Sequence, residues 1–158
     1  LAFILVLLLL TSSLILFSFD VVCDSLPVLK AIFGTSILTS FSIAKRYFDR
    51  STYSKNIRLH IGNALDIIPT LNDNFQLAFI DADKENYSVY FDLISKKLDL
   101  NGYIIADNVL WSGKVTKAKK DRDTKALDLY NKKVFNNPLF ESILLPIRDG
   151  LMITRKIK

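Results

Sequence analysis

Phe79-Ile-Asp-Ala-Asp-Lys-Glu-Asn-Tyr87 ends an apolar run in two carboxylates and a lysine. A second stretch, Ile104-Ile-Ala-Asp-Asn-Val-Leu-Trp-Ser-Gly-Lys114, has the same form, because its apolar run ends in Asp107 and Asn108. In an open parallel sheet, ligands bind beyond the carboxyl ends of the strands. The two stretches therefore predict one polar site at the ends of two buried strands.

The chain around these stretches alternates strand and helix patterns. Strands are expected at Ile57–Ile61, Gln76–Ile80, Tyr103–Ala106, Phe140–Ile147 and Leu151–Ile157, and helices at Ile37–Phe48, Ala64–Leu71, Tyr87–Leu98 and Thr124–Phe135. This order predicts an α/β fold with a mostly parallel sheet that is covered on both faces. Arg148-Asp149-Gly150 joins the last two strands into an antiparallel hairpin.

Residues 1–35 form an atypical apolar N-terminal segment ahead of the globular part, residues 36–158. No charge occurs before Asp20, and about 20 apolar residues match the length of a membrane span. Two other interpretations are open, namely buried strands broken at Thr11-Ser-Ser13 and a corrupted reading frame. The expected location is the cytoplasm, with membrane attachment through residues 1–19 as the alternative.

Composition excludes several classes of site. With 158 residues the chain fits one domain with a hydrophobic core. Cys23 is the only cysteine and His60 the only histidine, so a disulfide framework, a Cys-rich zinc site and a multi-histidine metal site are excluded. The net charge is +5, but the basic stretch Lys114–Lys120 lacks the stacking aromatics of a nucleic-acid interface, so no nucleic acid is expected as a partner.

The strand ends predict a site for a hard cation and a base. Asp81, Asp107 and Asn108 offer carboxylate and amide oxygens, which suit Mg²⁺, Mn²⁺ or Ca²⁺. The alternative is that the two aspartates only cap the helices that follow. Lys84 would lose its proton more readily beside such a cation and could act as a base. Its alternative is an ordinary surface charge.

Several linked motifs closely resemble one family. Phe79–Tyr87, Ala106–Val115, Leu145–Lys156 and Arg46–Leu71 resemble the cation-dependent O-methyltransferases, the caffeoyl-CoA and catechol O-methyltransferase-like enzymes that use S-adenosylmethionine. The resemblance covers about residues 36–158. It implies a Rossmann-like class I methyltransferase sheet and a small phenolic substrate with two vicinal hydroxyl groups.

The resemblance also implies catalytic and metal-binding roles. Asp81, Asp107 and Asn108 match the family's metal ligands, with Mg²⁺ as the first expectation. Lys84 matches its general base. Asp81 further matches the residue that touches both the cofactor and the substrate hydroxyl.

Two more residues match family positions with narrower roles. Ala64 lies where a backbone amide meets the adenine of S-adenosylmethionine. Trp111 lies where the family lines its substrate entrance, although it could simply be a half-buried aromatic. A homodimer is the expected assembly.

One family feature is missing. The cofactor turn after the first strand needs glycine, but no glycine precedes Gly34, and Thr11-Ser-Ser13 is a degenerate stand-in at best. We expect residues 1–35 to supply strands in place of the family's first strands. The alternative is an inactive remnant that keeps the metal loop but binds S-adenosylmethionine poorly.

Overall fold

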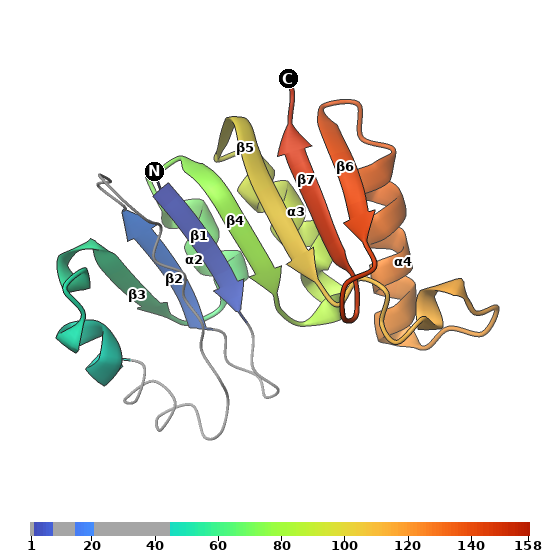
Figure 1. Cartoon of the computed structure of the whole chain (residues 1–158), viewed down its shortest axis with the longest axis horizontal. Coiled ribbons are helices and arrows are strands. Elements are labelled where there is room, and N and C mark those ends of the chain that lie inside the picture. Colours follow the sequence, from blue (N-terminus) through green and yellow to red (C-terminus); the bar gives the residue numbers. More distant parts are fainter. Residues whose placement is uncertain (1, 8–14, 21–44) are drawn as a thin grey trace.

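A computed structural model describes residues 2–7, 15–20 and 45–158, and these residues contain a seven-stranded sheet (Figure 1). The strand order is β3-β2-β1-β4-β5-β7-β6. The strands are β1 Ala2–Leu7, β2 Ile15–Asp20, β3 Ile57–Ile61, β4 Phe75–Asp81, β5 Leu98–Asp107, β6 Phe140–Leu145 and β7 Leu151–Lys156.

Strand direction divides the sheet into a parallel core and antiparallel flanks. Strand β4 pairs in parallel with both β1 and β5, whereas β2 and β7 run antiparallel to their neighbours. The carboxyl ends of β1, β4 and β5 therefore lie on one edge of the sheet, the lower edge in Figure 1. The α/β fold class is confirmed, including its antiparallel C-terminal hairpin.

The N-terminal residues supply strands, as expected. Strand β1 takes the place beside β4 that would otherwise be an exposed edge, and β2 lies between β1 and β3. Strand β2 is reversed relative to a fully parallel sheet, because only residues 8–14 connect Leu7 to Ile15. A parallel crossover needs a dozen or more residues. The boundary at residue 35 lies outside the described residues.

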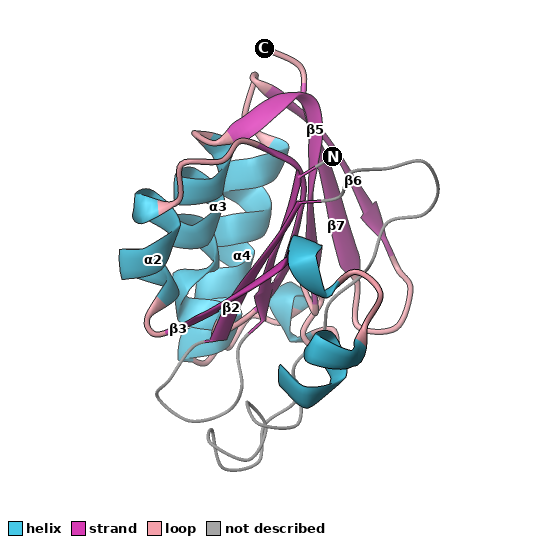
Figure 2. Cartoon of the chain, turned by 90° about the vertical axis from the view of Figure 1, so that its left-hand side faces the viewer, coloured by secondary structure: helices cyan, strands magenta, loops and turns pink. Residues whose placement is uncertain are grey.

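Three helices lie on one face of the sheet (Figure 2). They are α2 Ala64–Thr70, α3 Tyr87–Ser95 and α4 Arg122–Phe135. Asn63 caps α2, because its side chain accepts a hydrogen bond from the Leu65 amide. Of the expected helix Ile37–Phe48, residues 45–48 lie in a described helical segment, 45–50, and the rest lies outside the described residues. No helix in the described ranges is long and apolar enough to cross a bilayer.

Short 3₁₀ turns complete the described structure at Ser54–Asn56, Lys84–Asn86 and Lys114–Thr116. The second and third follow β4 and β5. Helix α3 ends three residues before the predicted limit because the chain turns at Lys96 and Lys97 to begin β5 at Leu98.

The core lies between the sheet and the three helices. Its largest fully buried side chains are Tyr87, Tyr90, Tyr130, Phe75, Phe91, Ile68, Ile80, Ile94 and Ile104. The expected cover on both faces is seen on one only, as far as the described residues extend. On the other face, Leu77, Phe79 and Ile105 are half-buried, and Tyr103 and Ile143 are 41% and 57% exposed. Alternation along each strand separates these two sets of side chains.

Candidate functional site

The predicted polar site forms where β4 and β5 end. Asp81 is the last residue of β4 and Asp107 the last of β5, and the strands pair side by side up to Ile80 and Ala106. The adjacent parallel strands therefore bring the two carboxylates to the same edge. Neither aspartate caps a helix, since the side-chain caps among the described helices come from Asn63 and Asp121.

Lys84 lies at the centre of the site. Its side chain is only 8% exposed, so the surface-charge alternative is wrong. Its Nζ donates to Asp81 Oδ1 at 3.3 Å, to Asn108 Oδ1 at 3.2 Å and to the Tyr87 hydroxyl at 2.6 Å. The 3₁₀ turn Lys84–Asn86 directs the lysine back over the end of its own strand.

Burial lowers the pKa of Lys84 from its ordinary value. Desolvation of the ammonium is the largest cause, and the charges of Asp81, Asp107 and Asp149 oppose it without cancelling it. The amine therefore gives up its proton more readily than a lysine in water, as a base at this position requires.

The oxygens around Lys84 fit a hard cation. The Lys84 ammonium shows that Asp81 Oδ1 and Asn108 Oδ1 already converge on one positive charge. Asn108 adopts a left-handed backbone conformation, φ 60°. Its backbone N–H donates a hydrogen bond to Asp107 Oδ1 at 2.7 Å. Asparagine tolerates that conformation better than most residues. The described residues hold no group of three or more His, Cys, Asp or Glu that could bind a metal ion.

Tyr87 is a site residue that sequence reasoning missed. Its side chain is fully buried, and its hydroxyl donates to the Asp107 carbonyl at 2.9 Å while accepting from Lys84. The sequence predicts Tyr87 as the first residue of a helix, which gives no sign that its hydroxyl reaches the strand ends. Only its place at the end of the motif, three residues after Lys84, could have signalled this.

Trp111 joins the site from the loop after β5. Its ring centroid lies 5.5 Å from Lys84 Nζ, so the structure brings it to the predicted cluster. Its left-handed backbone, φ 50°, is fixed by a hydrogen bond from its amide to the Asn108 carbonyl. The ring is half-buried.

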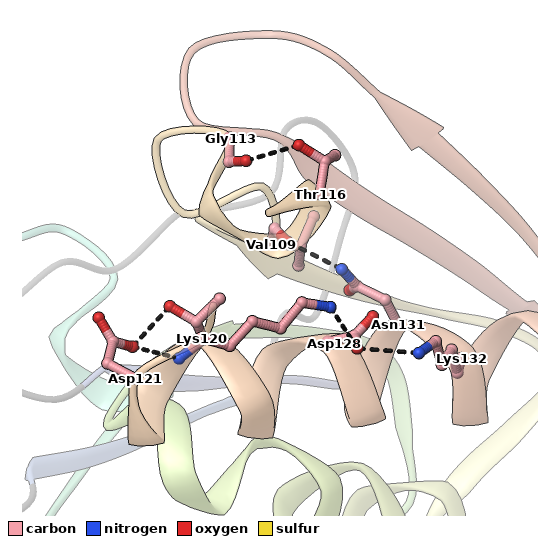
Figure 3. A network of polar contacts seen from close by, with 9 residues as sticks. Val109, Gly113, Thr116, Lys120, Asp121, Asp128, Asn131 and Lys132 are labelled. Atoms are coloured by element: carbon pink, nitrogen blue, oxygen red, sulfur yellow. Dashed lines mark hydrogen bonds and ion pairs between the residues drawn. The ribbon is translucent and has the colours of Figure 1, made fainter. Parts of the chain in front are cut away.

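The hairpin turn and α4 hold the loop that carries Trp111. The amides of Val109 and Leu110 donate to the carbonyls of Gly150 and Asp149. Asn131 of α4 donates to the Val109 carbonyl at 2.8 Å (Figure 3). Asp149 was predicted only as a turn residue. In the structure its carboxylate accepts a hydrogen bond from the Ser112 backbone amide, and its negative charge raises the pKa of Lys84.

A charged network fixes the far end of the same loop. Asp128 accepts from Lys120 at 2.6 Å and from Lys132 at 2.8 Å, and Asp121 caps α4 through Thr124 (Figure 3). A cleft of about 620 Å³ opens between the start of α4 and Glu85, the residue after Lys84. The loop is therefore anchored at both ends.

Ala64 is not brought to this cluster. It is fully buried at the start of α2, after β3. Strands β2 and β1 separate β3 from β4 in the sheet. Any ligand that touches both Ala64 and Asp81 must therefore extend along the sheet edge past the ends of these strands.

Comparisons with known proteins identify what the chain resembles. A model of the O-methyltransferase family matches residues 30–157. Tricin synthase 2 from Oryza sativa subsp. japonica is 26% identical over 85% of this chain and 53% of its own length. The "probable caffeoyl-CoA O-methyltransferase 3" of Dictyostelium discoideum is 30% identical over 70% of this chain and 52% of its own length. The chain thus spans about half the length of these relatives.

Solved structures share the fold. The O-methyltransferase TomG from Streptomyces achromogenes, solved in complex with SAM, superposes with a TM-score of 0.69 at 22% identity, over 77% of this chain and 59% of its own. The O-methyltransferase from Bacillus cereus, solved in complex with SAH, superposes with a TM-score of 0.68 at 22% identity. The match covers 78% of this chain and 61% of that protein. These two likenesses support the fold alone.

Proposed function

The chain belongs to the O-methyltransferase family, and we propose that it transfers a methyl group from S-adenosylmethionine to a hydroxyl of a small vicinal-dihydroxy phenol. The observation that carries this proposal is the buried Lys84, whose Nζ meets Asp81, Asn108 and Tyr87. A lysine with a lowered pKa beside hard oxygen donors suits removal of a phenolic proton.

A divalent cation belongs to the proposal, with Mg²⁺ as the first choice and Mn²⁺ or Ca²⁺ as alternatives. Asp81, Asp107 and Asn108 would hold it. Two carboxylates and an amide suit a hard cation and leave coordination positions for hydroxyl oxygens. When bound, the ion would make those hydroxyls more acidic.

The chemistry of this chain's own residues then follows. Lys84 accepts the proton of one phenolic hydroxyl at Nζ. The oxygen attacks the methyl carbon of the sulfonium donor, the O–C bond forms as the C–S bond breaks, and the electron pair stays on the sulfur. Asp81 is proposed to border both the phenol and the sulfonium donor. Alignment of the attacking oxygen, the methyl carbon and the sulfur supplies most of the rate acceleration.

The phenolic ring is proposed to lie beside Trp111. The indole ring is half-buried and 5.5 Å from Lys84 Nζ, measured from its centroid. An aromatic wall next to the base favours a flat, apolar substrate ring. The fixed loop geometry supports this role, because both the hairpin turn and α4 hold the residues around the tryptophan.

The donor is proposed to lie along the sheet edge between Asp81 and the backbone amide of Ala64. One observation favours a second candidate, a family member that keeps the acceptor site but does not bind the donor. Strand β2 is reversed, and the connection at residues 8–14 contains no glycine. A cytoplasmic location and a homodimer stay predictions from the sequence.

Two measurements test these functions. Turnover with S-adenosylmethionine, Mg²⁺ and a catechol-type acceptor should give a methylated product by mass spectrometry. Calorimetric titration with S-adenosylmethionine separates the two candidates. No heat of binding at millimolar donor would reject the enzyme and leave the non-binding family member.

A further inference from the structure

We propose that Tyr87 is a positioning residue of this site, whose hydroxyl orients the Lys84 amine and ties the end of β4 to the end of β5. The inference rests on the proposed function for its kinetic test. It goes further by assigning a role to a residue that itself touches neither substrate nor cation.

With Lys84 as an ammonium, the hydrogen bonds of the Tyr87 hydroxyl have one consistent arrangement. The Asp107 carbonyl can only accept, so the single phenolic proton points to it, over 2.9 Å. The lone pairs of the phenolic oxygen then face Lys84 Nζ at 2.6 Å and the Ala82 amide at 3.4 Å. One oxygen therefore joins the loop after β4 to the last residue of β5.

The surroundings keep this phenol fixed and neutral. The side chain is fully buried, and its ring meets the ring of Tyr130 edge to face, with centroids 5.4 Å apart. Burial raises the pKa of Tyr87 well above its ordinary value, so the hydroxyl keeps the proton that it donates. Helix α3 begins at Tyr87, which anchors the residue to the core.

The position of Lys84 depends on this contact. Its other two partners are oxygens of Asp81 and Asn108, both proposed to hold a cation. With a cation on those oxygens, the Tyr87 hydroxyl would be the remaining hydrogen-bond partner of Lys84 among the described residues. The hydroxyl would thus keep the amine beside the acceptor site.

Tyr130 provides a matched control. It is also a fully buried tyrosine in the same cluster, but its hydroxyl has no hydrogen-bond partner among the described residues. Tyr87→Phe and Tyr130→Phe remove the same atom from neighbouring rings. Only the first removal breaks contacts to the site.

The kinetic test compares these two variants with the unchanged protein. Tyr87→Phe is expected to lower kcat by about 10- to 100-fold, the cost of a misplaced reacting group. The KM values for donor and phenol should stay within about twofold. Tyr130→Phe should retain the unchanged kcat. A Tyr87→Phe kcat within about twofold of the unchanged protein overturns the proposal, as does a loss shared by both variants.

A second readout needs no turnover. The protons on Lys84 Nζ, detected through their ¹⁵N label, are expected to show a nuclear Overhauser effect to the Tyr87 ring protons. The contact should appear in the ligand-free protein and in Tyr130→Phe. The signal should broaden or shift in Tyr87→Phe. Absence of that contact in the unchanged protein overturns the proposal, even if Tyr87→Phe does not fold. If the contact is present but no phenol is methylated, the proposed function fails while the role of Tyr87 in holding Lys84 stands.

Discussion

Leu7 pairs with Asp81 across β1 and β4, so the chain leaves β1 directly beside the first oxygen donor of the proposed site. Asp107 lies on the opposite side of β4, at the end of β5. Asp81 therefore lies between the edge proposed for the donor and Asp107, the second carboxylate proposed for the cation. The two aspartates should respond differently to substitution.

Asp81→Asn is expected to weaken the binding of both S-adenosylmethionine and Mg²⁺, whereas Asp107→Asn weakens Mg²⁺ binding alone. Loss of a carboxylate ligand should cost at least about tenfold in cation affinity, because even outer-shell changes cost that much. Separate calorimetric titrations with donor and Mg²⁺ measure both effects. Equal donor affinity in the two variants would contradict the proposed position of Asp81.

Lys84→Ala is expected to abolish methyl transfer while Mg²⁺ binding persists. A positioned base contributes about 10²- to 10⁴-fold to rate, and the cation ligands are left in place. Turnover assays and Mg²⁺ titration give the two readouts. Lys133→Ala is the control, because Lys133 pairs with Asp92 outside the site. Retained turnover in Lys84→Ala would remove Lys84 from the base role.

Asp128→Asn should reduce stability at neutral pH but not in acid. Hydrogen bonds from Lys120 and then Lys132 lower the pKa of Asp128. A lowered folded pKa stabilises the protein above the unfolded pKa of about 4, and this stability is lost as pH falls through the folded value. The expected loss in free energy of unfolding at pH 7 is about 1 kcal/mol.

Urea unfolding of Asp128→Asn at several pH values measures this effect. Asp123→Asn, on the same helix, is a suitable control because Asp123 forms no ion pair within the described ranges. The free energy of unfolding of Asp128→Asn could instead differ from that of the unchanged protein by the same amount at pH 7 and in acid. That result would show that the ion pairs of Asp128 contribute nothing to stability.

Gly150→Ala should destabilise the protein more than Gly113→Ala. Both glycines have left-handed backbones, φ +86° and +71°, which cost an alanine about 1–2 kcal/mol. At Gly150 an added Cβ would also lie 2.5 Å from Cγ of Leu110, whereas at Gly113 nothing lies within 4 Å. Thermal unfolding of the two variants isolates the clash, expected at about 1–3 kcal/mol. Equal losses of stability in the two variants would mean that the loop around Leu110 shifts to accept the added Cβ at no cost in free energy.

Much of the site could be predicted because it follows directly from strand ends. Apolar runs that stop at Asp81 and Asp107 define both the strands and the residues beyond them, and neighbouring parallel strands must bring those ends together. These features depend on short stretches of sequence.

Other features depend on contacts between distant segments. The hydroxyl of Tyr87 reaches a carbonyl 20 residues away, and Asp149 contacts Ser112 across 37 residues. Neither link leaves a periodic mark in the sequence. Within the described residues, the expected cover on both faces is seen on one face only. Half-buried residues such as Leu77 and Phe79 have the apolar character expected of a strand that is buried on both faces, so the sequence did not reveal this difference.

The reversed β2 has a consequence for the order of assembly during synthesis. Leu7 pairs with Ile15, eight positions along the chain, but also with Asp81, 74 positions away. The β1–β2 hairpin can close locally within about 1–10 μs. The other edge of β1 must wait until β4 has been translated. At 5–20 residues per second, the roughly 60 residues between β2 and the end of β4 keep that edge unpaired for about 3–12 s in every nascent chain.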